Sequence, residues 1–127
     1  MDLQEYFKTE KGTGILSTAD AAGFVNSAVY ATPHTMEEGL LAFNMRERKT
    51  YDNILVNPHV CYLFIEAGKL SGKRIYLTKS KEEKNSELLF SLRRRCKHEA
   101  CETDEDLHLV FFSVDKVLPL VGDGGVE

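Results

Sequence analysis

The stretch FNMRERKTYDNILVNPHV, residues 43–60, places three basic side chains in a short loop directly before a predicted helix. A helix start carries partial positive charge on its unpaired N–H groups, so cations there are unfavourable unless an anion binds beside them. A phosphate would accept hydrogen bonds from backbone amides, the Thr50 hydroxyl and the charged groups of Arg48 and Lys49. The stretch therefore predicts a site for a phosphomonoester, with Arg46 as a fourth candidate contact.

The size of these interactions indicates what else the ligand contains. Charge-assisted hydrogen bonds contribute about 1.5–3 kcal/mol each, so two or three of them give only a few kcal/mol at a site open to water. Micromolar binding requires about 8 kcal/mol after the costs of association. Burial of a ring system over ~200 Å² would supply about 4–6 kcal/mol. We therefore expect a phosphate attached to a large flat heterocycle, such as a nucleotide or a flavin.

Length and composition indicate a single domain over residues 1–127. The chain has 127 residues, 43% of them hydrophobic and 28% charged, as is usual for a globular protein. Its net charge of −4 disfavours general attraction to nucleic acid or to an anionic membrane surface. No apolar stretch is long enough to span a membrane, no secretory signal is visible in the first residues, MDLQEYFK, and the three cysteines form no CxxC pair. These features predict a cytoplasmic protein.

Periodicity and turn residues predict a mainly β chain. Asp2 and Glu5 have capping-box spacing, which favours a short helix over 2–10 that ends near Gly12. A hairpin is expected around the turn at Asp20–Gly23. The predicted strands cover 13–18, 24–31, 40–45, 60–67, 73–79 and, as one long or two short strands, 107–121.

Two further helices are predicted between these strands. The first covers 50–57, and the second opens at a capping box formed by Ser80 and Glu83 and continues to residue 96. The count of about six mostly antiparallel strands with short turns predicts a small β-barrel with helical insertions. The inner face of the helix predicted over 50–57 is expected to consist of Tyr51, Ile54 and Leu55.

The ordered set of a strand, a basic loop, a helix and an apolar strand resembles the FMN-binding split-barrel family. That family includes pyridoxamine 5′-phosphate oxidases and small bacterial FMN-binding proteins. The resemblance is carried by Lys49, Asn53-Ile54 and Asn57–Val60, and by the preceding hairpin GILSTADAAGFVNSAVYATP at 14–33. It implies a six-stranded antiparallel split barrel that binds FMN as a homodimer, with the flavin near the subunit interface. The implied function is that of a flavin-dependent oxidoreductase or electron carrier.

The resemblance also implies roles for individual residues. The phosphate would be held by the basic loop, the isoalloxazine edge would lie along the strand before it, and the neighbouring strand would contact the ring or the phosphate. The implied phosphate contacts are Arg48, Lys49, Thr50 and Arg46; the ring-edge segment is Phe43, Asn44 and Met45; the neighbouring strand contributes Asn26, Ser27 and Ala28.

This chain departs from the family pattern in two places. Glu47 stands where many members carry Ser or Thr, so its carboxylate must point away from the phosphate or weaken the site. True pyridoxamine 5′-phosphate oxidases end in a segment that contains Trp and Arg, whereas this chain has no Trp and ends in LPLVGDGGVE. Oxidation of pyridoxamine phosphate is therefore not expected. No catalytic acid or base is predicted, because the flavin itself carries the reactivity.

Other interpretations remain open for this sequence. The basic residues would also suit a solvated turn. A related barrel could bind a deazaflavin, or haem with His34 or His59 as an axial ligand. Glu47 favours a third alternative, a dimeric interaction protein that has lost its cofactor. A metal site is not predicted, because the possible zinc ligands are only Cys96, His98 and Cys101, at a spacing that no common zinc finger uses.

Overall fold

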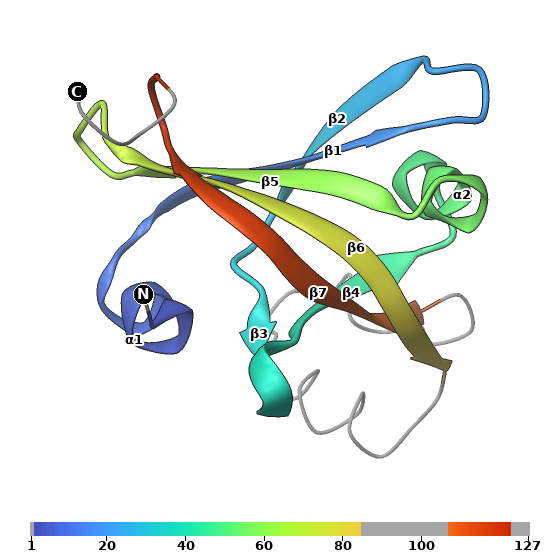
Figure 1. Ribbon diagram of the computed structural model, residues 1–127, viewed down its shortest axis with the longest axis horizontal. Coiled ribbons are helices and arrows are strands. Elements are labelled where there is room, and N and C mark those ends of the chain that lie inside the picture. Colours follow the sequence, from blue (N-terminus) through green and yellow to red (C-terminus); the bar gives the residue numbers. More distant parts are fainter. Residues whose placement is uncertain (1, 85–106, 123–127) are drawn as a thin grey trace.

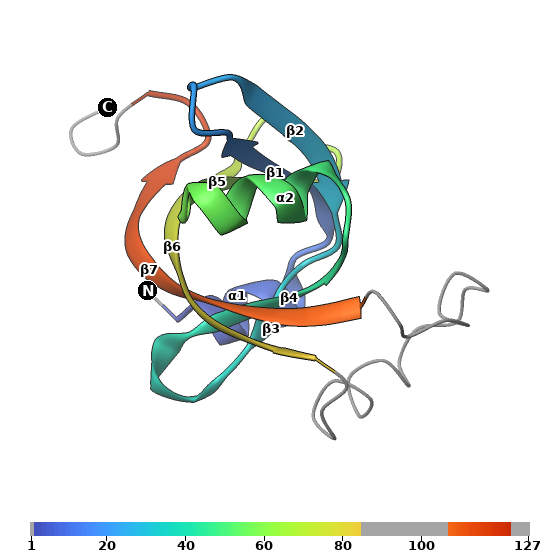
Figure 2. The ribbon, with the colours of Figure 1, turned by 90° about the vertical axis from the view of Figure 1, so that its right-hand side faces the viewer.

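The computed structural model describes residues 2–84 and 107–122, and the strands among them form one antiparallel sheet in the order β2-β1-β5-β6-β7-β4-β3. The sheet curls into a half-barrel around a packed interior, which is seen end-on in Figure 2. Figure 1 shows the two helices at opposite ends of the long axis. The elements are α1 (Leu3–Thr9), β1 (Gly12–Ala19), β2 (Val25–Tyr30), β3 (His34–Thr35), a 3-10 turn (Glu37–Gly39), β4 (Leu41–Arg46), α2 (Lys49–Val56), β5 (His59–Glu66), β6 (Gly72–Lys84) and β7 (Leu107–Pro119).

The predicted mainly β, antiparallel architecture is confirmed, with seven strands in the described residues instead of six. The additional strand is β3, in which His34–Thr35 pairs with Leu41–Ala42 of β4. A strand of two residues is too short to show an alternating pattern in the sequence. The last segment forms a single long strand, β7, which is one of the two forms that the sequence allowed.

The β1–β2 hairpin has the turn that its sequence predicts. Gly23 has a φ of 91°, a conformation that L side chains rarely adopt. The Asp20 carboxylate accepts hydrogen bonds from the backbone N–H groups of Ala22 and Phe24, both at 2.9 Å. This local pattern is typical of Asp in turns and fixes the register of the whole hairpin.

The predicted helix start at Ser80 is wrong. Strand β6 continues through Ser80 and Glu83 to Lys84, and it pairs with β7 as far as His108. Pairing with a long neighbouring strand therefore outweighs a local capping signal. The rest of the predicted helix, to residue 96, and the Cys96–Cys101 motif lie outside the described residues.

The assignment of Gly12 to a helix end is also wrong. Helix α1 ends at Thr9, and Gly12 is the first residue of β1, opposite Glu66 of β5. A Cβ atom at Gly12 would collide with the backbone carbonyl of Ile65. Glycine at this position allows the close approach of β1 and β5.

Helix α1 closes one end of the barrel. As the capping box predicts, Asp2 Oδ1 accepts hydrogen bonds from two first-turn N–H groups at 3.0 and 3.3 Å. The rings of Tyr6 and Phe7 pack edge-on against Phe64, with centroid distances of 5.9 and 5.4 Å. Neither this helix nor any other in the described part of the chain is long and apolar enough to cross a membrane.

Helix α2 lies across the other end (Figure 2) and is oriented by a buried polar pair. Tyr51 and Ile54 face the core as predicted, but Leu55 is 55% exposed, which contradicts its predicted place on the inner face. The helix instead buries Asn53, whose Nδ2 donates to Thr18 Oγ1 on β1 at 3.0 Å. With Asn53 held against β1 in this way, the helix is oriented with Leu55 on its solvent-exposed side.

We expect Asn53→Ala to lower the free energy of unfolding by about 1–3 kcal/mol, because the buried Thr18 hydroxyl would lose its partner. Urea unfolding followed by circular dichroism would measure the change. The double variant Thr18→Val/Asn53→Leu should lose less than the sum of the single variants, because no buried polar group is left unpaired. A loss below about 0.5 kcal/mol for Asn53→Ala, as is usual for surface positions, would contradict this role of the pair.

Candidate functional site

The loop between β4 and α2 presents an uncapped helix start to its surroundings. Arg48 is the N-cap residue, with an extended backbone (φ −127°, ψ −169°), and its side chain makes no capping hydrogen bond. Ser, Thr, Asp or Asn normally occupies this position and bonds a first-turn N–H. The first-turn amides have no partner within the helix itself, so they are available to an anion.

The basic side chains of this loop differ in accessibility. Arg48 and Lys49 are exposed, whereas Arg46, the last residue of β4, is partly buried. Thr50 is only 4% exposed, and its hydroxyl is directed towards β2. An anion arriving from solvent would therefore meet Arg48 and Lys49 first.

Strand β2 supplies the inner wall of this site. Asn26 Nδ2 donates to Thr50 Oγ1 at 3.4 Å, and Tyr30 on the same strand interacts with Thr50. Burial raises the pKa of Tyr30, although the bond to Thr50 and the nearby charge of Arg48 oppose the shift. The contact of Tyr30 with the loop joins residues that are distant in sequence, so no local pattern could have predicted it.

The predicted segment Asn26–Ala28 is divided between two faces, because side chains alternate along a strand. Asn26 and Ala28 are partly buried on the face towards α2, while Ser27 is exposed and its Oγ lies 2.9 Å from Ser17 Oγ. The structure thus brings Asn26 to the loop and directs the Ser27 side chain away from it.

The predicted ring-edge segment on β4 is divided in the same way. Phe43 and Met45 point into the core, where the Phe43 ring contacts Tyr30, Tyr62 and Phe112. Asn44 points to the opposite face, and its Oδ1 is buried with no hydrogen-bond partner within the described residues. The side chains of Phe43 and Met45 therefore serve the core, and only the backbone of this part of β4 is available to a ligand.

Open strand edges lie beside the helix start. Among the described strands, β2 is the last strand at one margin of the sheet, and β4 pairs on its outer side with β3 only at Leu41–Ala42. Backbone N–H and C=O groups of β4 from residue 43 onwards are therefore not used by a described strand on that side. Helix α2 contacts β1, β2 and β4, which brings both edges to one end of the barrel (Figure 1).

Glu47, the acidic residue of the loop, bonds to strand β7. Its Oε2 lies 2.8 Å from Nε2 of His108, and the His108 side chain is only 7% exposed. Register explains the contact, because His108 lies opposite Met45 near the end of β4. The carboxylate that the sequence placed among the loop cations is thus paired with a ring from the far end of the chain.

His108 is held on its other side by β6 and α2. Its Nδ1 lies 3.0 Å from Glu82 Oε2, which also accepts a 2.6 Å hydrogen bond from the Tyr51 hydroxyl. Burial raises the pKa of Tyr51, and the hydrogen bond to Glu82 adds to this shift. Burial opposes ionisation of Glu82 too, but its hydrogen bonds from Lys79 and Tyr51 outweigh this effect and lower its pKa. No sequence pattern identified Glu82 or His108, since β6–β7 pairing alone joins them.

The lowered pKa of Glu82 predicts a contribution to stability at neutral pH. That contribution is fully present above the pKa of an unfolded glutamate and is lost as the pH falls through the lower folded value. Glu82→Gln should therefore lower the thermal midpoint at pH 7 and reduce its decline in acid. Thermal unfolding of both proteins from pH 7 to pH 3 would measure this, and parallel curves for the two would contradict it.

The residues at this site fit a phosphate group. Two exposed cations and the first-turn amides of α2 offer positive charge and N–H donors, with Arg46 as a nearby third cation. The Glu47 carboxylate of the loop is bonded to His108, and Asp52 adds an exposed carboxylate in the first turn of α2. Open backbone edges of β2 and β4 offer further polar contacts beside an aromatic core. The predicted phosphate contacts are thus compatible with a phosphorylated ligand that also has a flat ring.

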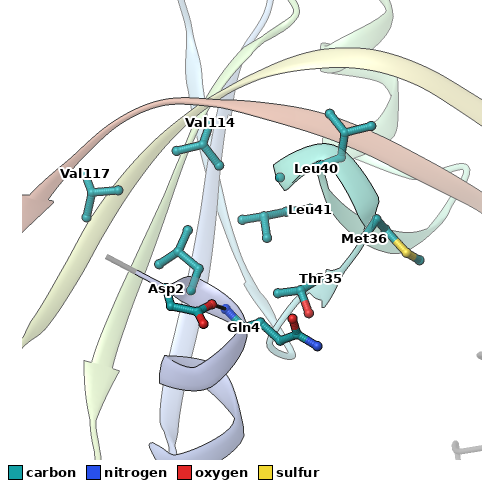
Figure 3. A pocket seen from close by; sticks show the side chains of 10 residues that line it. Asp2, Gln4, Thr35, Met36, Leu40, Leu41, Val114 and Val117 are labelled. Carbon is teal, nitrogen blue, oxygen red and sulfur yellow. Dashed lines mark hydrogen bonds between the residues drawn. The ribbon is translucent and has the colours of Figure 1, made fainter.

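A separate cavity lies at the α1 end of the barrel and lacks these features. It has a volume of about 540 Å³ and is bounded by α1, β3, β4 and β7 (Figure 3). Its lining is mostly aliphatic, including Leu40, Val114 and Val117, and the described residues that line it include no cationic side chain. The Asp2 carboxylate at its rim is occupied by capping α1. This cavity therefore offers nothing to a phosphate.

His59, one of the alternative haem ligands in the sequence, bonds to strand β6. Its Nδ1 lies 3.1 Å from Thr78 Oγ1, and Thr78 donates to Asp115 Oδ2 at 2.6 Å. The threonine hydroxyl thus gives its proton to a carboxylate, which is not the arrangement of an activated nucleophile. Among the described residues, no group of three or more His, Cys, Asp or Glu side chains could hold a metal ion.

Comparison with known proteins shows the same fold in solved structures. An FMN-binding protein from Syntrophomonas wolfei subsp. wolfei superposes with a TM-score of 0.78 at 18% identity, over 94% of this chain and 84% of that one. An F420 reductase superposes with a TM-score of 0.73 at 15% identity, over 92% and 97%. The haem storage protein HutZ from Vibrio cholerae gives 0.68 at 23% identity, over 90% and 89%. The chain has the split-barrel fold.

These similarities show the fold and do not show the function of this chain. No family model matches the sequence, and no curated protein matches it either. The split barrels named above are described as an FMN-binding protein, an F420 reductase and a haem storage protein, so the fold alone does not select a cofactor. Any ligand of this split barrel has to be inferred from its own side chains.

Proposed function

We propose that this split barrel binds FMN, with the phosphate at the start of α2, and acts as a flavin-dependent oxidoreductase or electron carrier in the cytoplasm. The observation that carries this proposal is the position of Arg48, Lys49 and the uncapped first turn of α2 beside the open edges of β2 and β4. The FMN-binding protein among the structural neighbours supports a flavin in this fold. The phosphate-binding character of the loop favours FMN over haem.

Different residues of the chain would bind different parts of FMN. Arg48 and Lys49 neutralise the phosphate, and the first-turn amides donate to its oxygens. Thr50, fixed by Asn26 and Tyr30, holds the helix start against β2. The backbone of Phe43–Met45 is placed to contact the edge of the ring. When bound, FMN supplies hydride or single-electron transfer, so the protein provides position, charge and exclusion of water.

We also propose a homodimer with the flavin near the subunit interface. Five apolar side chains of the β1–β2 turn, β2 and the end of α2, which we call the β2–α2 face, are between 55% and 78% exposed. Exposed apolar patches of this kind usually mark an interaction surface, and a chain of 127 residues has limited interior for a flavin. A second copy would cover the patch. The β2–α2 face consists of Phe24, Val25, Val29, Leu55 and Val56.

Val29→Asp should convert the dimer to a monomer, because it places a charge at the centre of an apolar interface. Val29 is 74% exposed in the single chain, so the monomer should remain folded. Sedimentation equilibrium would give the mass of each variant. Val121→Asp, at an exposed position outside the β2–α2 face, is the matched control and should remain dimeric. Unchanged mass for Val29→Asp would exclude this face as the interface.

Titration of the purified protein with FMN and with riboflavin would test the proposed function. Visible absorbance of the freshly isolated protein should show flavin bands, and the removed flavin should rebind with a clear preference for FMN over riboflavin. Equal affinity for the two ligands would exclude the phosphate site. A Soret band would indicate haem, tighter binding of a deazaflavin would indicate that cofactor, and a colourless protein that FMN does not stabilise thermally would indicate a cofactor-free function.

A further inference from the structure

His108 connects the phosphate loop to the barrel wall, although it lies far from the loop in sequence. Its two ring nitrogens lie between two carboxylates, with Nε2 2.8 Å from Glu47 Oε2 and Nδ1 3.0 Å from Glu82 Oε2. The pairing therefore places the imidazole ring directly against the acidic side chain of the loop.

The imidazole ring is also fixed in orientation. Tyr51 stacks on it, with ring centroids 4.3 Å apart and an interplanar angle of 19°. The Tyr51 hydroxyl donates to Glu82, and Lys79 Nζ lies 2.6 Å from the other Glu82 oxygen. His108 itself is 5% exposed. Because α2 and β6 both hold the His108 ring, the ring has little freedom to release Glu47.

The position of Glu47 makes this contact important for an anion. Glu47 stands between Arg46 and Arg48, in the loop that would carry the phosphate. Its side chain is 46% exposed, so a carboxylate released from β7 could turn towards a bound anion and repel it. The histidine counters this because it holds the carboxylate against β7.

We propose that His108 is a positioning residue for phosphate binding, an inference that rests on the proposed function: it holds Glu47 against β7, so that the Glu47 carboxylate is kept away from the phosphate. His108 itself does not contact the ligand. The loop of this chain therefore tolerates an acidic residue at a position next to its phosphate-binding cations, provided that the β7 histidine is present.

Three variants would test this role: His108→Gln, Glu47→Gln and the combination of both. Dissociation constants for FMN and for riboflavin would be measured by flavin fluorescence. His108→Gln should weaken FMN binding about tenfold, the effect of one like-charge contact of about 1.4 kcal/mol, and should change riboflavin binding less than about twofold. Glu47→Gln should bind FMN as well as the original protein or better, and the double variant should recover most of the lost affinity. His59→Gln, a histidine bonded to Thr78, is the matched control.

Each outcome decides the matter. Unchanged FMN affinity in His108→Gln, equal losses for FMN and riboflavin, or no recovery in the double variant would overturn the role of His108. If His108→Gln does not fold, Glu47→Gln alone decides, since a tenfold loss of FMN affinity there would show that the carboxylate helps binding. If the original protein does not prefer FMN over riboflavin, the proposed function fails first, and it does so independently of any His108 variant.

Discussion

FMN binding is expected to weaken about a hundredfold when Arg48 and Lys49 are both replaced by alanine, while riboflavin binding changes less than about threefold. Each side chain would lose a charge-assisted contact worth about 1.5 kcal/mol at this exposed site, and about 3 kcal/mol in total corresponds to this factor. Riboflavin has the same ring without the phosphate, so the ratio of the two affinities isolates the loop. Fluorescence titration with both flavins would measure it.

Lys8→Ala is the matched control for this pair of substitutions. Lys8 is an exposed cation on α1, at the opposite end of the barrel (Figure 1), so its loss alters the net charge without touching the loop. Its FMN affinity should stay within about twofold of the original protein at physiological salt, where distant charges are screened. If the Arg48/Lys49 variant lost affinity for FMN and riboflavin equally, the phosphate would bind elsewhere.

Phe64→Ala is expected to lower the free energy of unfolding by about 3–5 kcal/mol, a large part of the about 5–15 kcal/mol that holds a domain together. Phe64 is 0% exposed on β5, and its ring meets both Tyr6 and Phe7 of α1. Its removal would leave a cavity and loosen the helix that closes this end of the barrel. Urea unfolding followed by circular dichroism would measure the loss.

Leu70→Ala provides the control for Phe64→Ala. Leu70 is 84% exposed in the turn between β5 and β6, so its truncation should change stability by less than about 0.5 kcal/mol. A loss below about 1 kcal/mol for Phe64→Ala would mean that the α1 end of the barrel repacks easily. It would also mean that the aromatic contacts described here contribute little to the fold.

Local patterns in the sequence predicted the features that depend on neighbouring residues. The hairpin at Gly23, the cap at Asp2 and the strand of alternating residues on β5 are confirmed because turn chemistry and side-chain period act over a few residues. The predicted helix at Ser80 fails for the opposite reason. The polar segment KSKEEK, residues 79–84, lies in a strand whose stability comes from pairing with β7, which the local sequence does not show.

The candidate site also contains both residues that local sequence patterns predict and contacts that they do not predict. Arg48, Lys49 and the helix that follows them could be predicted because they are contiguous in the chain. The contact of Tyr30 with Thr50 and the pairing of Glu47 with His108 could not, because each depends on how distant strands are placed in the sheet. The sequence places an acidic residue, Glu47, beside the cationic side chains of the loop. The register of β4 with β7 supplies the partner that the acid needs.

The strand order has a consequence for how the protein matures during synthesis. Apart from the short β3, the described partner of β4 is β7, whose residues come from the last part of the described chain. Strand β4 must therefore wait, while residues 47–106 are made, before its main neighbour is synthesised. We expect a nascent chain that stops short of β7 to be unable to load the proposed flavin, so that cofactor acquisition follows the synthesis of β7.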